Sequence, residues 1–465
     1  MNELNNLPVP SDSISVTERL ITGFSDMAWG TPLLVLLLGG GLFFLLYSRM
    51  LPFRYFRHAI AILLGRYDDP DEPGQINHYQ ALSTALAATV GMGNITGVAL
   101  AITMGGPGAI FWMWVSALLG VTTKYFTCTL AVMFRGRDSK GELQGGPMYV
   151  IVEGLGRNWR PLAVFFSLMG MIGVLPMFQV NQLTQVVRDV VLIPNHVEAG
   201  FSSDLISGLI VALLVGVVIF GGIKRIGKVT GRMVPIMVAL YVILVLFIIF
   251  SNTGSILPSF ALIFQDAFSA SSVLGGSLGA LVITGVRRAA FSNEAGIGTA
   301  PMAHGAAKTN EPVREGLVAM LGPVVDTIIV CTMTALALIM TGVWNAGESD
   351  GITMTADAFE LAMPGIGAYL LTICVVVFSL STMLSFPYYG TKCFSFIFGA
   401  KHSYIYKWFY LVTIPLGATA TLGTVVGIFD GAYALMAFPT MISALLLSPH
   451  VVRASKDYFR RLKNQ

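Results

Sequence analysis

The stretch Ala87–Gly97 reads AATVGMGNITG and interrupts an apolar segment, residues 79–104, that carries no charged side chain. Three glycines and one asparagine lie in the middle of a segment long enough to cross a lipid bilayer as a helix. Glycine costs about 1 kcal/mol relative to alanine inside a helix, and asparagine competes for backbone hydrogen bonds. The sequence therefore predicts a membrane-spanning helix that breaks at mid-span. Such breaks are tolerated only where the freed backbone groups line a cavity or are buried in protein.

The composition places the whole chain in a membrane. Of its 465 residues 55% are apolar and 11% are charged, whereas a soluble domain is roughly 25% charged. The 28 basic and 25 acidic side chains cannot cover a soluble protein of this size. These values exclude a soluble enzyme, a nucleic-acid binder and a disordered scaffold. We expect an all-α integral membrane protein with the lipid bilayer as its surroundings.

Eleven apolar stretches are long enough to span the bilayer as helices. They lie near residues 31–48, 79–104, 107–134, 161–187, 204–221, 233–250, 271–290, 315–342, 365–391, 408–427 and 430–449. The apolar runs are continuous and do not alternate with polar residues as the strands of a membrane barrel do. We therefore predict about 11 transmembrane helices.

The basic residues predict the orientation of these helices. With eleven spans, 25 of the 28 Lys and Arg side chains fall on one side and two on the other. Positive loops face the cytoplasm, so the C-terminus is expected inside and the N-terminus outside. Residues 1–30 show no signal peptide. The segment Pro52 to Gly65 is either a cytoplasmic interfacial helix or a loop helix packed on the bundle.

Glycines also gather in the seventh stretch, at Gly276, Gly279 and Gly285. The second and seventh stretches are five apart, which indicates two five-helix repeats of inverted topology whose broken helices meet at the bilayer midplane. The expected order is an extracytoplasmic segment (1–30), a first span with an interfacial helix (31–78), two repeats (79–250 and 251–450) and a cytoplasmic tail (451–465).

Broken helices at membrane depth can bind both ends of a zwitterion and a cation. The N-terminus of a half-helix offers free N–H groups to a carboxylate, and the C-terminus of a half-helix offers carbonyl groups to a cation. An amino acid and a sodium ion fit this arrangement, with Gly276 and Gly279 taking part at the second break. The alternative is that the glycines only allow the helices to pack closely.

Polar side chains within other spans are further candidates. Gln179 follows Pro176, which is expected to kink the fourth span. Ser381 and Thr382 belong to a hydroxyl cluster in the ninth span, suited to a hard cation or to hydrogen bonds within their own helix. Asp326 is a functional candidate as an intramembrane carboxylate, which could carry a proton, pair with Lys124 or lie near the cytoplasmic interface. The four cysteines show no spacing typical of a metal site or a disulfide framework.

Long sequence strings resemble the alanine/glycine:cation symporters, which are sodium:amino-acid carriers of bacteria and archaea. They are residues 81–91 (ALSTALAATVG), 105–114 (GGPGAIFWMW), 145–149 (GGPMY) and 291–296 (FSNEAG). The resemblance implies an eleven-helix carrier in which one helix precedes a five-plus-five inverted repeat of the leucine-transporter type. It also implies secondary active transport by alternating access, at the plasma (inner) membrane of a bacterial cell.

The resemblance further implies residue roles. The substrate carboxylate is expected on the unwound part of the second span, Gly91, Met92, Gly93 and Asn94, with Gln179 reaching the substrate and Phe386 lining it. The coupling ion, Na⁺, is expected between the second and ninth spans. Its expected ligands are Ala87, Val90, Phe378, Ser381 and Thr382.

The sequence departs from the family pattern at several places. Met92 stands where threonine is usual, and Phe386 where tryptophan is usual. The other departures are Thr127, Pro176, Ser385, Pro387 and Thr391. Because Met92 and Phe386 line the expected pocket, they bear on its volume and therefore on which amino acid it accepts.

Several alternatives stay open at this stage. The carrier could be coupled to sodium or to protons and take a larger neutral amino acid such as glutamine, or the chain could be a non-transporting amino-acid sensor. An enzyme is not expected, since no catalytic motif is present and Glu294 and His304 are assigned to a cytoplasmic loop with a structural role. A channel is disfavoured because the breaks occur once per repeat and not as a ring.

Overall fold

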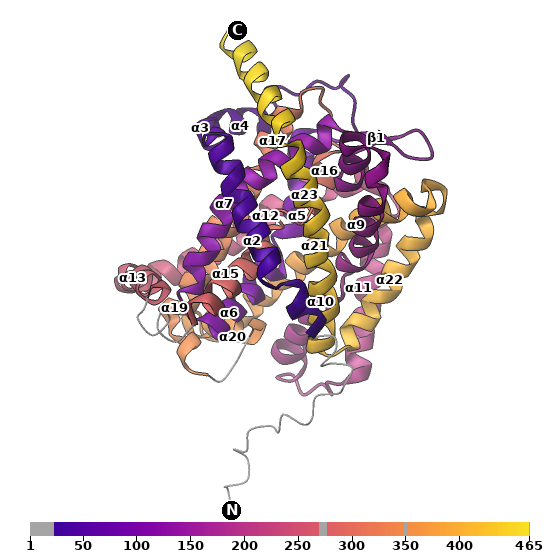
Figure 1. The fold of residues 1–465 in the computed structure, drawn as a ribbon. Coiled ribbons are helices and arrows are strands. Elements are labelled where there is room, and N and C mark those ends of the chain that lie inside the picture. The colour runs from indigo at the N-terminus through magenta and orange to yellow at the C-terminus, as the bar shows by residue number, and fades with distance from the viewer. Residues whose placement is uncertain (1–22, 269–276, 348–350, 465) are drawn as a thin grey trace, which may run out of the picture.

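The computed structural model describes residues 23–268, 277–347 and 351–464, and almost all of them are helical (Figure 1). Eight of the described helices are long and apolar enough to cross a membrane, and nine if the bent pair α5 and α6 is counted as one span. Helices α15 and α22 have 17 residues each and fall just short of this length. The helical membrane class is thus confirmed, whereas the count of eleven spans is not.

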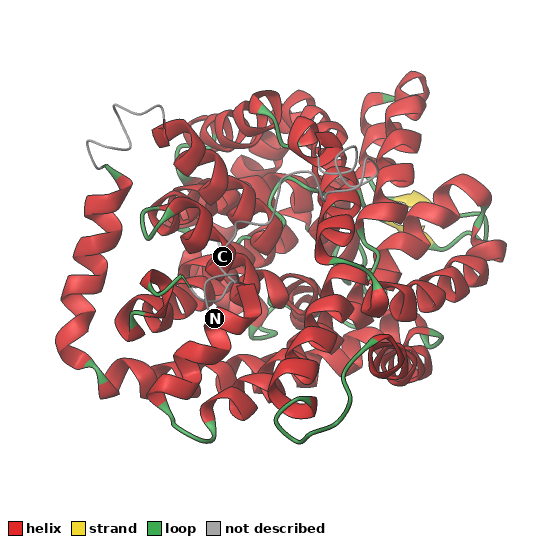
Figure 2. Cartoon of the chain, turned by 90° about the horizontal axis from the view of Figure 1, so that it is seen from below, coloured by secondary structure: helices red, strands yellow, loops and turns green. Residues whose placement is uncertain are grey.

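The first half of the chain contains most of the short elements. Its helices are α2 (Thr31–Tyr47), α3 (Leu51–Arg54), α4 (Phe56–Leu63), α5 (His78–Thr89), α6 (Met92–Gly105), α7 (Ala109–Met133), α8 (Pro147–Tyr149), α9 (Arg160–Gly173), α10 (Met177–Val186), α11 (Phe201–Ile219) and α12 (Gly222–Ser251). The antiparallel strands β1 (Gly136–Arg137) and β2 (Leu143–Gln144) form a hairpin at one side of the bundle (Figure 2). The fourth span is interrupted before Pro176, as predicted, between α9 and α10.

The second half contains the longest helices. They are α13 (Ile256–Ala267), α15 (Ser277–Asn293), α16 (Thr299–His304), α17 (Pro312–Ala319), α18 (Leu321–Pro323), α19 (Thr332–Thr341), α20 (Gly351–Ala362), α21 (Gly367–Phe398), α22 (Ser403–Thr419) and α23 (Leu422–Lys463). π-Helical segments extend α8 at Val150–Leu155 and α10 at Val187–Leu192, and a third, Val324–Cys331, joins α18 to α19. π-Helical turns within helices often occur at functional sites.

Two broken spans lie at the centre of the bundle. Helix α5 packs against α12, α16 and α21, while α15 packs against α6 and α7. Figure 1 shows α3, α4, α16 and α17 at the end of the bundle that carries the C-terminus, and α6, α13, α15 and α20 at the opposite end. Both broken spans therefore run from one end of the bundle to the other.

The segment expected as an interfacial helix packs on the bundle. It forms α3 and α4, and α4 packs against α17. Tyr55 stacks on Phe459 of α23 with ring centroids 3.6 Å apart, and a hydrogen bond of 2.8 Å joins His58 to Tyr458. These contacts favour the second of the two interpretations of this segment.

Arg287 and Arg288 lie away from the loop to which the sequence assigned them. Arg287 donates to Asp26 at 3.0 Å and to Asp430 at 3.1 Å. The helix that carries it, α15, lies toward the end of the bundle opposite the C-terminus (Figure 1). Both arginines occupy the middle of α15, because that helix continues to Asn293. Moving these two side chains changes the division predicted from the sequence from 25 and 2 to 23 and 4, which stays strongly one-sided.

Candidate functional site

The first helix break lies where the sequence predicted it. Helix α5 ends at Thr89 and α6 begins at Met92, with a bend of 41° between them. The N–H of Gly91 donates to Asn94 Oδ1 at 2.8 Å. The first N–H groups of α6, on Met92 and Gly93, have no carbonyl partner within the helix because a helix leaves its first turn unpaired. The N-terminal end of α6 thus offers donors to an anionic group.

The same break approaches α21 very closely. The Thr382 hydroxyl donates toward the carbonyls of Ala87 at 3.1 Å and Phe378 at 3.3 Å, and Ser381 donates to Phe378 at 2.7 Å. A Cβ on Gly91 would lie 2.5 Å from Thr382 Oγ1, so only glycine leaves room for this hydroxyl. The result is a buried cluster made only of hydroxyl and carbonyl oxygens, the ligand type that hard cations prefer.

The second break lies further along the chain than predicted. Helix α15 runs unbroken through Gly279 and Gly285, and Gly276 lies outside the described residues. The interruption falls instead at residues 294–298, between α15 and α16. Glu294 adopts a left-handed backbone conformation there, with φ of 57°, which is costly for a residue with a Cβ. Glu294 is therefore part of a mid-span break and not of a loop at the end of the bundle.

Asp326 links the two breaks. Its carboxylate accepts hydrogen bonds from Asn94 at 2.8 Å, from Ser292 at 2.7 Å and from Thr327 at 2.8 Å. Asn94 lies in the first turn of α6 and Ser292 in the last turn of α15, so a single buried side chain holds both half-helices. Among the described residues Asp326 has no ion pair within 4.0 Å, so the pairing with Lys124, one of the alternatives for this residue, is not formed.

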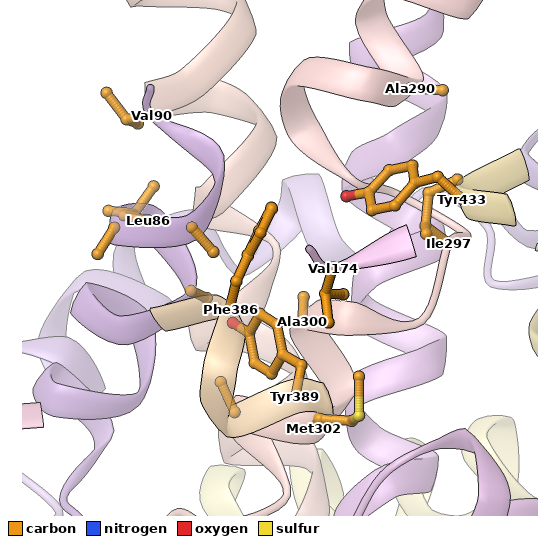
Figure 3. Packing of buried hydrophobic residues seen from close by; sticks show 14 of the residues in the cluster. Leu86, Val90, Val174, Ala290, Ile297, Ala300, Met302, Phe386, Tyr389 and Tyr433 are labelled. Atoms are coloured by element: carbon orange, nitrogen blue, oxygen red, sulfur yellow. The ribbon is translucent and has the colours of Figure 1, made fainter. Parts of the chain in front are cut away.

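A small, nearly closed central cavity of about 10 Å³ lies between the two breaks. It is lined by Ala88, Thr89, Gly91, Met92, Gly93, Gln179, Phe291, Glu294, Thr382, Phe386, Phe429 and Tyr433. Gln179 Oε1 is buried there without a hydrogen-bond partner. Figure 3 shows Phe386 of α21 and Tyr433 of α23 approaching the space beside α5 from two sides. The cavity thus has a polar wall at the breaks and an aromatic wall opposite.

The structure brings most of the predicted site residues together. Gly91, Met92, Gly93, Gln179 and Phe386 line the central cavity. Asn94 is not part of the lining, because its side chain turns to Asp326 and to the backbone of Gly91. Gly279 is exposed in the first turn of α15 and does not line the cavity.

Besides Ala88 and Thr89 at the first break, sequence reasoning missed four residues of the lining. Phe291 and Glu294 lie in the string 291–296, which was used only for the resemblance, and Phe429 and Tyr433 come from α23. A signal for Glu294 existed, since ionisable side chains at membrane depth are functional candidates by default. Phe429 and Tyr433 carry no such local signal.

A second buried polar cluster lies between the cavity and the C-terminal end of the bundle. We call it the His–Glu–His cluster: Glu315 of α17 contacts the Nδ1 atoms of His78 of α5 and His304 of α16, the latter at 2.5 Å. All three side chains are fully buried. The cluster ties the second half-helix of the second break to the first half-helix of the first.

Comparisons with known proteins agree with this geometry. A model of the sodium:alanine symporter family matches residues 14–465. The chain is 41% identical to the sodium/alanine symporter AgcS of Methanococcus maripaludis, over 96% of this chain and 98% of that protein. It is 32% identical to the probable sodium/glutamine symporter GlnT of Bacillus subtilis, over 96% and 92%.

Among solved structures, the crystal structure of MhsT in complex with L-phenylalanine has a TM-score of 0.54. It is 13% identical, and the match covers 82% of this chain and 98% of that one. At this identity the likeness shows a shared fold alone. Because the family match covers nearly the whole chain and is joined by a relative of 41% identity, the chain belongs to the sodium:alanine symporter family of membrane transporters.

Proposed function

We propose that this sodium-coupled amino-acid symporter carries a small neutral amino acid of the alanine/glycine class by alternating access. One observation carries the proposal: two broken helices meet at a single buried cavity, with free N–H groups and an unpaired side-chain oxygen on its wall. Broken helices at mid-depth are how many transporters bind substrate and coupling ion side by side.

The substrate carboxylate binds at the N-terminal end of α6. Met92 and Gly93 line the cavity with N–H groups that have no partner within the helix, and the helix dipole adds a favourable field. Gln179 supplies a further polar contact, which would satisfy its unpaired Oε1 or its amide. Asn94 acts indirectly, since its side chain holds the backbone of Gly91 in place.

The narrowness of the cavity favours a very small side chain. Its volume of about 10 Å³ is close to the room of one water molecule, so each added carbon of a substrate must displace more of the walls. Met92 and Phe386 project into this space and are both buried. AgcS, named for alanine, is also more similar to this chain than GlnT, named for glutamine. Both points support alanine or glycine over a larger substrate.

The sodium ion binds between α5 and α21. Its ligands are the Ser381 and Thr382 hydroxyls with the carbonyls of Ala87, Val90 and Phe378; Val90 follows the end of α5 and is fully buried. The close approach of Gly91 to Thr382 supports an ion site beside the cavity, where occupancy of one site would affect the helix break that forms the other.

The proposal includes the orientation and the repeat structure. The end with most of the basic side chains, which carries the C-terminus, faces the cytoplasm of a bacterial cell. The two five-helix repeats occupy residues 79–250 and 251–450, with their broken helices crossing at the cavity.

Uptake by purified protein in liposomes tests the proposal. We expect labelled alanine or glycine to accumulate when sodium is higher outside, and not when potassium or a proton gradient replaces the sodium gradient. Accumulation of only a larger amino acid would contradict the substrate class. Proton-driven accumulation without sodium would contradict the coupling ion, and amino-acid binding without any accumulation would instead support a sensor.

A further inference from the structure

We propose that the Glu294 carboxylate binds the ammonium group of the substrate and thereby selects amino acids against other small carboxylic acids. This inference rests on the proposed function and adds the second pole of the substrate to it. The carboxylate lies at the second helix break, lines the central cavity and is 2% exposed. The N-terminal end of α6 lines the same cavity from the first break, so the two poles of a zwitterion face groups of opposite sign.

The hydrogen bonds separate the roles of the two buried carboxylates. Asp326 accepts three side-chain hydrogen bonds, from Asn94, Ser292 and Thr327, and is thereby occupied in holding the breaks together. Glu294 accepts from the Thr299 hydroxyl at 2.5 Å through Oε2. A carboxylate has about four acceptor positions, so Glu294 retains capacity for a cationic donor in the cavity.

The charged side chains around the cavity carry one more negative than positive charge. Among the described residues no Lys, Arg or His lies within 4.0 Å of Glu294. Lys124 of α7 is buried nearby and attracts both Glu294 and Asp326, so one positive charge faces two negative ones. A buried charge without a partner is costly, and the ammonium group of an amino acid would balance this one.

The aromatic wall suits the same group. Phe291 lies edge-on to Phe429 at 6.0 Å between ring centroids, and Phe429 stacks on Phe386 at 6.2 Å and on Tyr433 at 5.6 Å. Ring faces attract cations, most strongly where water is excluded. An ammonium group held by Glu294 would therefore lie against an attractive surface, whereas a hydroxyl group in its place would gain much less.

The backbone at Glu294 agrees with a functional role. A φ of 57° is uncommon for a residue with a side chain, and strained residues that persist tend to cluster at binding sites. Glycine occupies the neighbouring left-handed positions, Gly296 and Gly298. The chain thus keeps a carboxylate at a position where glycine would fit more easily.

Competition between L-alanine and L-lactate tests the inference. Lactate has the same carboxylate and methyl group but a hydroxyl in place of the ammonium group. Binding of both compounds to purified protein in sodium would be compared for the wild type, Glu294→Gln and Glu294→Asp. The exposed Glu198→Gln removes the same charge far from the cavity lining and serves as the control.

We expect the wild type and Glu198→Gln to prefer alanine strongly. In Glu294→Gln the affinity for alanine should fall by about 30-fold or more, the usual loss on removing one partner of a buried charged contact, while lactate changes little. Glu294→Asp keeps the charge and should keep most of the preference, even if both affinities fall.

Each outcome bears on one proposal. Glu294→Gln with an unchanged alanine-to-lactate ratio overturns the ammonium site but leaves the transporter function intact. If Glu294→Gln does not fold, loss of the preference in a folded Glu294→Asp overturns the inference instead. A wild type that binds no amino acid in sodium overturns the proposed function and this inference with it.

Discussion

The substitution Gly91→Ala probes the proposed sodium site through a single contact. The added Cβ would lie 2.5 Å from Thr382 Oγ1, closer than non-bonded atoms approach. The backbone of Gly91 is extended, with φ of −159°, so alanine introduces no backbone strain of its own. The Thr382 hydroxyl must therefore rotate away, or the helices must separate.

The two consequences differ in size and can be measured separately. Overpacking a buried contact costs about 1–3 kcal/mol, which lowers the melting temperature of the purified protein. Loss of one hydroxyl ligand from a cation costs about 1.5–3 kcal/mol. That corresponds to a rise of roughly 10- to 150-fold in the sodium concentration that half-saturates alanine uptake.

A matched control and a double variant complete the experiment. A Cβ on Gly97, within the same helix as Met92, meets no atom within 4 Å, so Gly97→Ala should leave both quantities unchanged. Combining Gly91→Ala with Thr382→Ala removes the clash and should restore the melting temperature to that of Thr382→Ala alone, without restoring sodium affinity. The reasoning is refuted if Gly91→Ala keeps wild-type sodium dependence, or if the double variant regains it.

Three further changes test the rest of the structure. Glu315→Gln removes the carboxylate shared by His78 and His304 and should lower the free energy of unfolding by about 3–5 kcal/mol. Its control, Glu311→Gln, breaks an exposed pair with Arg461 and should lower that free energy by about 0–1 kcal/mol. Equal melting temperatures of the two variants would contradict this. Asp326→Asn places an amide donor opposite the hydroxyls that now donate to the carboxylate, which should lower the free energy of unfolding by about 1–3 kcal/mol. In the folded variant, uptake of alanine should fall at least about tenfold. Uptake at the wild-type rate would show that the link between the breaks is dispensable. Met92→Ala widens the cavity and should improve competition by glutamine relative to alanine, so an unchanged competition panel would mean that another residue limits substrate size.

Local composition was sufficient to locate the first break. Glycine and asparagine within a charge-free apolar segment disfavour a continuous helix, and the chain bends between Thr89 and Met92. The fourth span is similarly interrupted before Pro176. In both cases the signal and the structural feature lie in the same few residues.

The second break could not be located in this way. Gly285 of α15 allows close packing, the alternative that the sequence left open: a Cβ there would lie 2.6 Å from the Ala109 carbonyl of α7. The helix tolerates Gly285 because this approach offsets its low helix propensity. The actual break contains Glu294, whose place at membrane depth depends on burial that only the folded bundle provides.

The aromatic side of the cavity lies beyond local inference for a different reason. Phe429 and Tyr433 belong to α23, more than 300 residues after Gly91, and nothing in their neighbourhood distinguishes them from other apolar residues of a span. Their role follows from how α21 and α23 pack around the breaks. Residues that shape a pocket from a distant helix become visible only with the structure.

The His–Glu–His cluster also limits how the protein can move. The single side chain of Glu315 contacts both α5 and α16, the two half-helices that point to the same end of the bundle. While both contacts hold, the two half-helices cannot separate from each other, so they move as one rigid body together with α17. A path from the cavity to that end of the bundle must then open in one of two ways. Either α5, α16 and α17 move together as this rigid body, or His78 or His304 first loses its contact with Glu315.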